Sequence, residues 1–573
     1  MTKAKLCATF SAFFRTKIDR LKQSIALTLS SLTSLPYLND IAFTGHPLTH
    51  IPPVTVAEVV AILKSIPSKS SPMDFIATSL IKSCHGVFSE LISRLANLSF
   101  NEGRFPSRFK TAQITPLLKK TGLDKSSPEN YRPISNLNNI SKILERLFLN
   151  RIRSHVTSCS NFNPFQSAYR SKHSTETALV YTVNNICRSA NEGNCTLLIS
   201  LDLSAAFDTV DHNLLMARLD NSFGIRGNFL SWIDSYITNR SQFVRIGRFS
   251  SKNTYCSCGV PQGSVLGPIL FNIYTSPIAS IAESYNTRQQ QYADDTQLYI
   301  ALSAQSLSQS LLSLENCLSH LRAWFCHNGL ALNPDKTDAV LFGTRNKLGS
   351  LSTLTHVDVA GTSVQLSKKV KILGATLDQQ LTFHDHVNSV CSASFYHLRS
   401  FRHVRPALTQ DIAKTLGSAV IGTKLDYANS ILHGTSSANI KRLQRVQNAL
   451  ARVVLSSPSP SATKNLQRLH WLPVQYRIRY KVCSLAYQSY TSTAPSYLSS
   501  TVSYYLPTRS LRSTDTQLLT VPRSRLVFAD RGFYIAGPTE WNNLPLTVRS
   551  ANSLSVFHSR LKTHLYRLAF SEP

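Results

Sequence analysis

Two adjacent carboxylates, Asp294 and Asp295, lie in the segment QYADDTQLYI (291–300) of a chain that is poor in acid. After them, Leu298 and Ile300 alternate with polar residues. This pattern predicts a β-hairpin whose tip displays both acids. Asp is also a common turn residue, so the pair alone is moderate support for a chemical site.

A third carboxylate is predicted at the end of a buried strand. The run 197–201 is almost continuously apolar, and Asp202 follows it directly. A carboxylate there is costly unless a cation neutralises it, although a strand-end cap is an alternative. If this strand lies beside the hairpin, Asp202, Asp294 and Asp295 converge and repel one another unless divalent cations lie between them. Oxygen ligands suit magnesium, and two such ions can activate a 3′-hydroxyl and stabilise a leaving pyrophosphate.

Between these acids lies the glycine-rich segment GVPQGSVLGPILFNIY, residues 259–274. Its glycines let the backbone approach a flat ligand, and the helical run that follows would fix its position. A tight turn leading into a core helix is the alternative. Gln262 stands between Pro261 and Gly263, where a polar amide would face whatever the loop approaches.

The composition favours a polyanionic partner. The 573 residues include 61 Lys+Arg and 31 Asp+Glu, which gives a formal charge of +30. The sequence contains no apolar run of about eighteen residues and no signal-peptide pattern, so we expect nucleic acid and not a membrane. The eleven cysteines include no C-x-x-C pair, a usage that fits a reducing compartment and offers no zinc framework.

The chain divides into three predicted regions. Residues 1–100 indicate a helical N-terminal extension or linker, and residues 101–378 alternate strand and helix patterns. Within the latter, the apolar spacing predicts a helix over 307–325. Residues 379–573 are mainly helical and basic, and 427–514 hold eleven Lys/Arg and no acid.

One predicted helix in the last region has an apolar stripe bordered by bases. The stripe comprises Ile440, Leu443, Val446, Leu450 and Val453, and the bases are Lys441, Arg442, Arg445 and Arg452. A core helix with solvated charges explains this pattern nearly as well as nucleic-acid binding does. The long acid-free stretch favours binding, because an ordinary solvated face mixes both signs. Such binding weakens steeply with salt. The apolar spacing over 554–568 indicates a terminal packing helix.

Five motifs occur in the order and approximate spacing of reverse-transcriptase palm motifs: LDLSAAFD, GVPQGSVLGPILF, YADD, GLALNPDKTDAVLFG and KILGATLD. Upstream, FKTAQITPLLKK, NYRPISNLNNISKILERL and PFQSAYRSKHSTETAL resemble the fingers of those enzymes. The residues within these motifs are similar to those of non-LTR (LINE-type) retrotransposons of the jockey-like group. The resemblance covers about 101–378 and extends more loosely to both ends. It implies an α+β, right-hand polymerase with fingers, a palm with an antiparallel sheet and a thumb, followed by a mainly helical basic region.

The resemblance also implies roles for individual residues. Asp202 and Asp294 would hold two magnesium ions, with Asp295 a weaker ligand and the carbonyl of Leu203 a further oxygen. Phe207 matches the steric gate that excludes a ribonucleotide 2′-hydroxyl, although core packing is a serious alternative for any Phe.

Further matches concern the nucleotide. Arg132 and one of Lys119 or Lys120 match bases that grip the triphosphate; without the resemblance, the lysines would be interpreted as a solvated face. Gln262 and Gly263 would line the templating base pair.

Three more residues match the family near the primer. Lys336, in the NPDK turn, matches a lysine that protonates the pyrophosphate leaving group, although a turn lysine is more often plain surface. Leu373 and Gly374 resemble the primer grip, a hairpin whose backbone supports the primer end. Tyr292 is interpreted as a packing residue beside the metals.

Two nuclease domains of related elements have no counterpart in the pattern of acids. Residues 1–100 hold five dispersed acids, and residues 381–573 hold seven, none clustered. An endonuclease or an RNase H domain would need converging metal ligands. We therefore expect the polymerase part of a longer element whose endonuclease part is missing. The family leads us to expect the nucleus and cytoplasm, and no targeting signal is seen.

The first function to consider is an RNA-directed DNA polymerase that extends a 3′-hydroxyl DNA primer at its target on an RNA template with deoxynucleoside triphosphates. The alternative is a catalytically silent nucleic-acid-binding relic of such an element. A host-adopted polymerase of telomerase or maturase type is a third possibility, but no added domain supports it. The intact Asp202, Asp294 and Asp295 favour the first.

Overall fold

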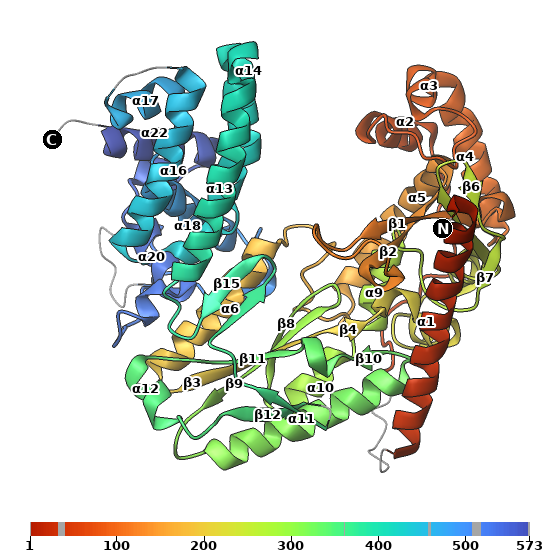
Figure 1. The fold of residues 1–573 in the computed structure, drawn as a ribbon, viewed down its shortest axis with the longest axis horizontal. Helices are drawn as coiled ribbons and strands as arrows, with labels where there is room; N and C mark the ends of the chain where they lie inside the picture. The colour runs from red at the N-terminus through yellow and green to blue at the C-terminus, as the bar shows by residue number, and fades with distance from the viewer. Residues whose placement is uncertain (1, 32–40, 360, 457–459, 507–516, 571–573) are drawn as a thin grey trace. The chain divides into compact units, whose positions relative to one another are not determined.

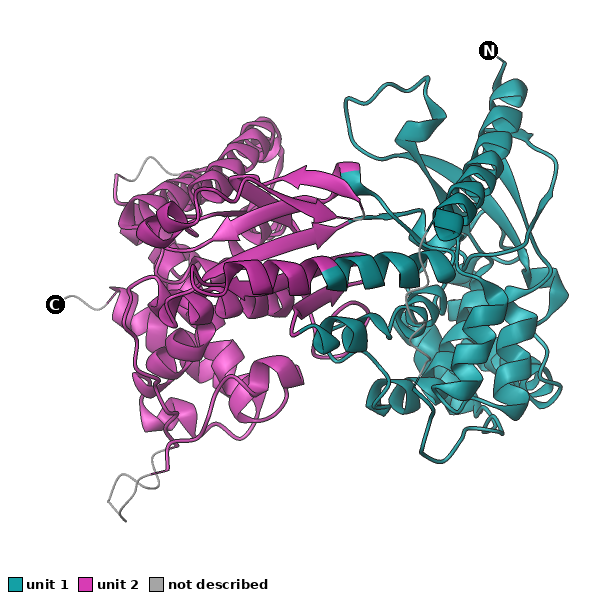
Figure 2. Cartoon of the chain, turned by 90° about the horizontal axis from the view of Figure 1, so that it is seen from below, with its two compact units in different colours: residues 1–166, 202–285, 316–334 teal, residues 167–201, 286–315, 335–573 magenta. Residues whose placement is uncertain are grey.

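The computed structural model describes residues 2–31, 41–359, 361–456, 460–506 and 517–570. The chain forms two compact units, each assembled from three separate segments (Figure 2). Unit 1 comprises residues 1–166, 202–285 and 316–334, and unit 2 comprises residues 167–201, 286–315 and 335–573. Helices and largely antiparallel sheets occur in both units, which confirms the α+β class (Figure 1). The region boundaries near 100 and 378 stay a prediction.

Aromatic packing holds the helices of unit 1 together. Trp232 stacks on Phe148 with 4.1 Å between ring centroids, and its indole N–H donates to the Ser99 hydroxyl at 2.9 Å. Phe100 packs edge-on against the same indole. The helices of this unit are α1 (Lys3–Ser31), α2 (Val56–Ser65), α3 (Thr78–Ser83), α4 (His85–Asn101), α5 (Asn139–Ser158), α7 (His212–Asn221), α8 (Gly227–Ile237), α9 (Gly267–Tyr274) and α10 (Ile278–Ser284).

The main sheet of unit 1 is mixed. Its strands are β1 (Thr111–Leu118), β2 (Tyr131–Asn136), β5 (Arg240–Ile246), β6 (Phe249–Ser250) and β7 (Thr254–Cys256). β1 pairs antiparallel with β2 and parallel with β5. The N-terminal helix α1 packs Phe10 and Phe14 against Ile114 and Val244 of this sheet.

A buried carboxylate fixes the start of α9. Glu145 of α5 is fully buried, and its Oε2 accepts hydrogen bonds from the backbone N–H groups of Val265 (2.7 Å) and Leu266 (3.1 Å) and from the Tyr236 hydroxyl (3.1 Å). Its Oε1 accepts from Ser141 at 3.1 Å. A negative charge is favoured at a helix N-terminus, where backbone N–H groups lack partners. Glu145 therefore sets the position of the glycine-rich segment that leads into α9.

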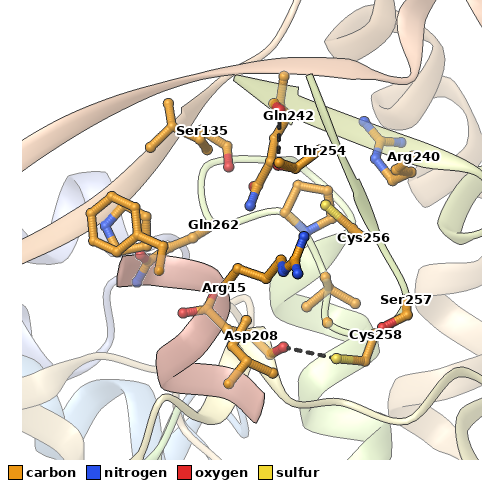
Figure 3. A pocket seen from close by; sticks show the side chains of 18 of the residues that line it. Arg15, Ser135, Asp208, Arg240, Gln242, Thr254, Cys256, Ser257, Cys258 and Gln262 are labelled. Carbon is orange, nitrogen blue, oxygen red and sulfur yellow. Dashed lines mark hydrogen bonds between the residues drawn. The ribbon is translucent and has the colours of Figure 1, made fainter. Parts of the chain in front are cut away.

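A pocket lies between α1 and the sheet of unit 1, beside Gln262 (Figure 3). Arg15 points into it from α1, and the buried Arg240 lines the opposite side, where Nη1 donates to the Tyr236 carbonyl at 2.9 Å. Asp208 also lines the pocket. Burial raises the pKa of Asp208 from an ordinary value of 3.8 to about 6, against a smaller opposing effect of a nearby lysine.

The central sheet of unit 2 has the strand order β11-β3-β9-β8, antiparallel throughout (Figure 1). The strands are β3 (Cys195–Leu201), β8 (Arg288–Tyr292), β9 (Asp295–Leu302) and β11 (Asp338–Phe342). The middle strands are almost wholly buried, as the apolar run 197–201 predicts. The helix α6 (Thr175–Asn191) packs along β3 and β8.

Two hairpins and two connecting helices complete the middle of the chain. The helix predicted over 307–325 is confirmed as α11 (Leu307–His327), and α12 (Arg345–Ser350) follows β11. The hairpins are β12 (His356–Val359) with β13 (Thr362–Gln365), and β14 (Lys369–Ile372) with β15 (Ala375–Asp378). In unit 1, the short strands β4 (Leu203–Ser204) and β10 (Ala331–Leu332) pair antiparallel.

The last third of the chain is helical, as predicted. Its helices are α13 (His384–Val404), α14 (Gln410–Gly417), α15 (Thr423–Asp426), α16 (Ser437–Leu455), α17 (Ala462–Leu469), α18 (Val474–Tyr490), α19 (Ser496–Ser499), α20 (Phe533–Asn542), α21 (Leu546–Arg549) and α22 (Leu554–Phe570). α18 packs against both α20 and α22 (Figure 1). Of the predicted packing residues of the terminal helix, Phe557, Leu561 and Leu565 of α22 are buried and Leu554 is half-buried, whereas Leu568 is exposed. No helix within the described ranges is long and apolar enough to cross a membrane.

We predict that Glu145→Ala lowers the free energy of unfolding by about 2–4 kcal/mol, because it leaves the buried N–H of Leu266, the part-buried N–H of Val265 and the Tyr236 hydroxyl without their acceptor. Urea denaturation followed by tryptophan fluorescence measures this loss. Glu283→Ala, at an exposed position of the same unit, is the matched control and should change the value by less than about 0.5 kcal/mol. Equal effects of the two substitutions would contradict the anchoring role.

We predict that Asp208→Asn stabilises the protein at neutral pH. The folded protein binds the Asp208 proton more tightly than the unfolded chain does, so the associated stability is full below pH 3.8 and is lost as pH rises through about 6. The variant lacks this ionisation and should exceed the wild type by at most about 3 kcal/mol at pH 7.5. The advantage should vanish toward pH 4. Melting temperatures measured across that range test this, and a pH-independent difference would refute it.

Candidate active site

The two adjacent acids lie at a hairpin tip, as their pattern predicts. Tyr292 of β8 pairs with Asp295 of β9, so Ala293 and Asp294 form a two-residue turn. Ala293 has φ 58°, in the left-handed region that non-glycine residues seldom adopt. Asp294 is half-buried and Asp295 is exposed. Partial burial and the nearby charge of Asp294 raise the pKa of the Tyr169 phenol, a neighbour that sequence reasoning missed.

Asp202 directly follows the buried strand β3, also as predicted. Leu201, the last residue of β3, lies opposite Thr296 in β9. Asp202 is the next residue after Leu201, and Asp295 is the residue before Thr296, so both acids adjoin the same rung of the antiparallel ladder. Consecutive Cα atoms are about 3.8 Å apart, which bounds how far Asp202 can lie from that rung.

The backbone on both sides of Asp202 is also held within unit 1. The Asp202 carbonyl accepts a hydrogen bond from the N–H of Asn333 at 2.9 Å. Leu203 pairs with Leu332 across the β4–β10 ladder. The family-implied oxygen ligand, the carbonyl of Leu203, therefore belongs to a two-stranded ladder.

The donor set fits a hard cation, although it is small. Carboxylate and carbonyl oxygens are the ligands that magnesium prefers. Within the part of the chain that the structure describes, no three His, Cys, Asp or Glu side chains lie close enough together to hold a metal ion by themselves. Asp294 and Asp295 belong to unit 2 and Asp202 to unit 1. Any ion held by these residues would need further oxygens from a carbonyl or a substrate.

The segment after Asp202 is tied to the glycine-rich segment in unit 1. The carbonyl of Phe207 accepts from the N–H of Val260 at 2.8 Å, and the half-buried ring of Phe207 stacks on Phe271 with 4.4 Å between centroids. The ring therefore packs on α9, while part of it is accessible. Core packing and the gate role are compatible at this position.

Gln262 and Gly263 lie against strand β2. The carbonyl of Gln262 accepts from the N–H of Ser135 at 3.0 Å. Gly263 has φ 120°, and a Cβ there would lie 2.7 Å from the Ser135 carbonyl oxygen, so a side chain is excluded on both grounds. Gly263 thus allows a close approach to β2, whereas the predicted approach to a flat ligand stays a prediction. The half-buried Gln262 side chain lies beside the pocket of Figure 3.

The predicted triphosphate-gripping bases lie on the edge hairpin of the same sheet. Arg132 of β2 is exposed and lies opposite Leu117 of β1. Lys119 and Lys120 follow β1 directly and are exposed; the ammonium of Lys119 donates to the carbonyl of Glu129 at 2.6 Å. These positions place Arg132 and both lysines on one hairpin, and their roles stay a prediction.

The remaining predicted residues occupy turns of unit 2. Leu373 (φ 45°) and Gly374 (φ 84°) form the two-residue turn between β14 and β15, the backbone form expected of a grip hairpin. Lys336 is exposed at the end of a short 3-10 turn, Pro334–Lys336, which immediately precedes the short connection to β11.

Part of the basic C-terminal charge is structural. Three bases of α18 each bind an acid from another element: Arg477 binds Asp426, Arg479 binds Glu540 and Lys481 binds Glu176. Bases of the acid-free stretch therefore form ion pairs with acids that lie outside this stretch. On α16, by contrast, Leu443, Val446 and Leu450 are buried, while Lys441, Arg445 and Arg452 are exposed, as the predicted stripe requires.

Glu145 of α5, which holds the glycine-rich segment in place, is the main residue that the sequence-based predictions missed. It lies on the buried face of α5, one turn from Phe148 and from Ser141. A signal did exist, because an acid on an otherwise apolar helix face must find buried partners.

Part of the chain matches a known protein family, and most of it is similar to known polymerases. Residues 118–377 match the family model of reverse transcriptase (RNA-dependent DNA polymerase). The probable RNA-directed DNA polymerase from transposon BS of Drosophila melanogaster is 28% identical over 418 residues, covering 71% of this chain and 45% of that protein. The RNA-directed DNA polymerase from mobile element jockey of the same species is 25% identical over 425 residues, covering 72% of this chain and 45% of that protein.

The chain thus spans less than half the length of these relatives. Among solved structures, apo telomerase from Candida tropicalis aligns with a TM-score of 0.37 and 13% identity, covering 73% of this chain and 71% of that one. Residues 118–377 thus match the reverse transcriptase family, and the chain is similar to RNA-directed DNA polymerases of non-LTR retrotransposons.

Proposed function

We propose that this protein is an RNA-directed DNA polymerase that extends the 3′-hydroxyl of a DNA primer on an RNA template. The observation that carries the proposal is the register of β3 and β9. Leu201 opposite Thr296 makes Asp202 and the Asp294–Asp295 turn adjoin the same end of the two central strands. Buried apolar strands that end together in carboxylates suit a cation-dependent reaction at a polyanionic substrate.

Reverse transcriptases use divalent metal ions, and Asp202, Asp294 and Asp295 would hold two magnesium ions here with the carbonyl of Leu203. When bound, the ions would lower the pKa of the attacking 3′-hydroxyl and stabilise charge on the leaving pyrophosphate. The carboxylates supply the negative charge and the hard oxygens that such ions require. The Ala293–Asp294 turn, in which Ala293 has φ 58°, would present the Asp294 carboxylate at the tip of the hairpin.

The incoming nucleotide is proposed to bind against unit 1 residues. Phe207 would press against the sugar edge that carries a 2′-hydroxyl in ribonucleotides, with Phe271 preventing the ring from retreating. Gln262 and Gly263 would face the templating pair, on a segment that Glu145 and Ser135 hold in place. Arg132 with Lys119 or Lys120 would bind the triphosphate, and Lys336 would donate a proton to the departing pyrophosphate.

The exposed bases of α16 are proposed to bind the nucleic-acid backbone. Lys441, Arg445 and Arg452 lie on the exposed side of a helix whose other side is buried. Ion pairs engage the bases of α18, so the exposed bases of α16, together with Lys464 and Arg468 of α17, carry the charge available for phosphates in the described part of this stretch.

We predict that wild-type protein extends a primed RNA template with deoxynucleotides in magnesium, and that Asp294→Asn or Asp202→Asn lowers the rate by at least about 10³-fold, because each removes charge that holds the ions. Gel analysis of labelled primer measures this. Asp358→Asn is the matched control, an exposed acid in another hairpin of unit 2, and should retain activity.

Absence of product from folded wild-type protein, with RNA binding retained, would instead support the catalytically silent alternative. Loss of activity in Asp358→Asn equal to that in Asp294→Asn would show that the change in rate is not specific to the proposed site.

We further predict that replacing Lys441, Arg445 and Arg452 together with Ala reduces the salt dependence of RNA binding. Loss of three phosphate contacts should lower the magnitude of the slope of log K against log salt concentration by about 2, at about 0.7 per contact with single-stranded RNA. The slope is obtained from binding constants for labelled RNA, measured by fluorescence anisotropy at salt concentrations from about 50 to about 300 mM.

The control removes the same number of charges from α1, where Lys3, Lys5 and Lys22 are exposed. A slope that falls equally in both variants would indicate a general charge effect and not a surface on α16.

A further inference from the structure

Tyr427 links the end of α15 to the β14–β15 turn of unit 2, and the function proposed above assigns it no role. It is the first residue after α15, and its phenol O–H donates to the carbonyl of Leu373 at 2.6 Å. Leu373 begins the β14–β15 turn that is proposed to support the primer. The Tyr427 side chain is 44% exposed, so one part of the ring contacts the turn and another part is accessible.

The turn needs the support that Tyr427 gives. Leu373, at φ 45°, is a branched residue in the left-handed region, where side chains other than glycine are strained. Gly374 faces the ring itself: a Cβ at this position would lie 3.3 Å from Cε1 of Tyr427. A hydrogen bond thus holds Leu373, and the Tyr427 ring leaves little room for a side chain at the next residue, Gly374.

The segment that carries Tyr427 is itself firmly anchored. Asp426 accepts a hydrogen bond from Nε of Arg477 in α18 at 2.7 Å. Ala428 is buried, and the Ser430 hydroxyl donates to Glu176 of α6 at 2.6 Å. Because α6 packs along β3 and β8, the anchor of Tyr427 is continuous with the sheet that carries the acidic hairpin.

We infer that Tyr427 is a positioning residue for the primer terminus: its hydrogen bond to Leu373 sets the place of the supporting turn relative to the hairpin that carries Asp294. The inference rests on the proposed function, in which the primer 3′-hydroxyl must be aligned for attack. Displacing a reacting group by about 1 Å can cost on the order of 10²-fold in rate, so loss of one fixed contact at this turn should be visible in the chemical step.

The test compares Tyr427→Phe with Tyr504→Phe. Tyr504 is a matched control in the same unit, because its hydroxyl also donates to a backbone carbonyl at 2.6 Å, that of Tyr490, and its side chain is also exposed. Single-nucleotide incorporation is measured by rapid quench on a primed RNA template, with rates normalised to titrated active sites. We expect Tyr427→Phe to lower the incorporation rate constant about 5- to 50-fold, with the apparent Kd for deoxynucleotide changed less than about twofold.

A second variant perturbs the same turn independently. Gly374→Ala should reproduce the loss, since it adds a Cβ against the Tyr427 ring at a position with φ 84°. Combined with Tyr427→Phe, its effect should be less than additive, as expected for residues in contact. Tyr504→Phe should stay within about twofold of the wild type.

An unchanged rate constant in Tyr427→Phe, or an equal loss in Tyr504→Phe, would overturn the inference. Failure of the proposed function gives a different result, namely no extension by the wild type. In that case amide hydrogen exchange over residues 369–378 decides whether Tyr427 holds the turn: faster exchange in Tyr427→Phe, but not in Tyr504→Phe, supports the contact, and unchanged exchange refutes it.

Discussion

The antiparallel pairing of β3 with β9 is the constraint on which the rest of the protein depends. A shift of one residue would turn each side chain of one strand to the opposite face of the sheet and would change which residues end the ladder. The observed register makes Leu201 and Thr296 the last paired rung, and an acid adjoins each of them, Asp202 after Leu201 and Asp295 before Thr296. The pairing of these two buried strands therefore decides which end of the ladder the carboxylates adjoin.

Local patterns predicted the elements that carry chemistry because each depends on neighbours in the sequence. Alternation identified the 292–295 hairpin, a continuous apolar run identified β3, and helical spacing identified α11. The glycine-rich segment predicted a backbone that can be approached closely, but it did not predict that Gly263 lies against Ser135. Patterns of this kind do not state which strands pair, and the order β11-β3-β9-β8 emerges only from contacts between distant segments.

Residues whose partners lie far along the chain were missed for the same reason. Glu145 binds the backbone of Val265, 120 residues away, and Tyr427 binds Leu373, 54 residues away. In the C-terminal third, the charge pattern predicted a basic surface correctly for α16 but not for α18. The absence of acid between 427 and 514 suggested an uninterrupted basic surface, whereas α18 uses acids from outside that stretch, such as Glu540, to neutralise its own bases. A count of charges along the sequence cannot distinguish bases that form a binding surface from bases that pair with distant acids. The difference lies only in which side chains contact one another in the fold.

The interleaving of the two units has a consequence for synthesis of the chain. Unit 1 is not complete until residue 334 has been made, and the sheet of unit 2 lacks its edge strand β11 until residue 342. Translation proceeds from the N-terminus at about 5–20 residues per second, so well over half of this polypeptide must emerge from the ribosome before either unit can close. The strand β3 gains its neighbour β9 only when residue 302 has been made and its neighbour β11 only when residue 342 has been made, and a nascent chain in that interval is the form most exposed to aggregation and most dependent on chaperones.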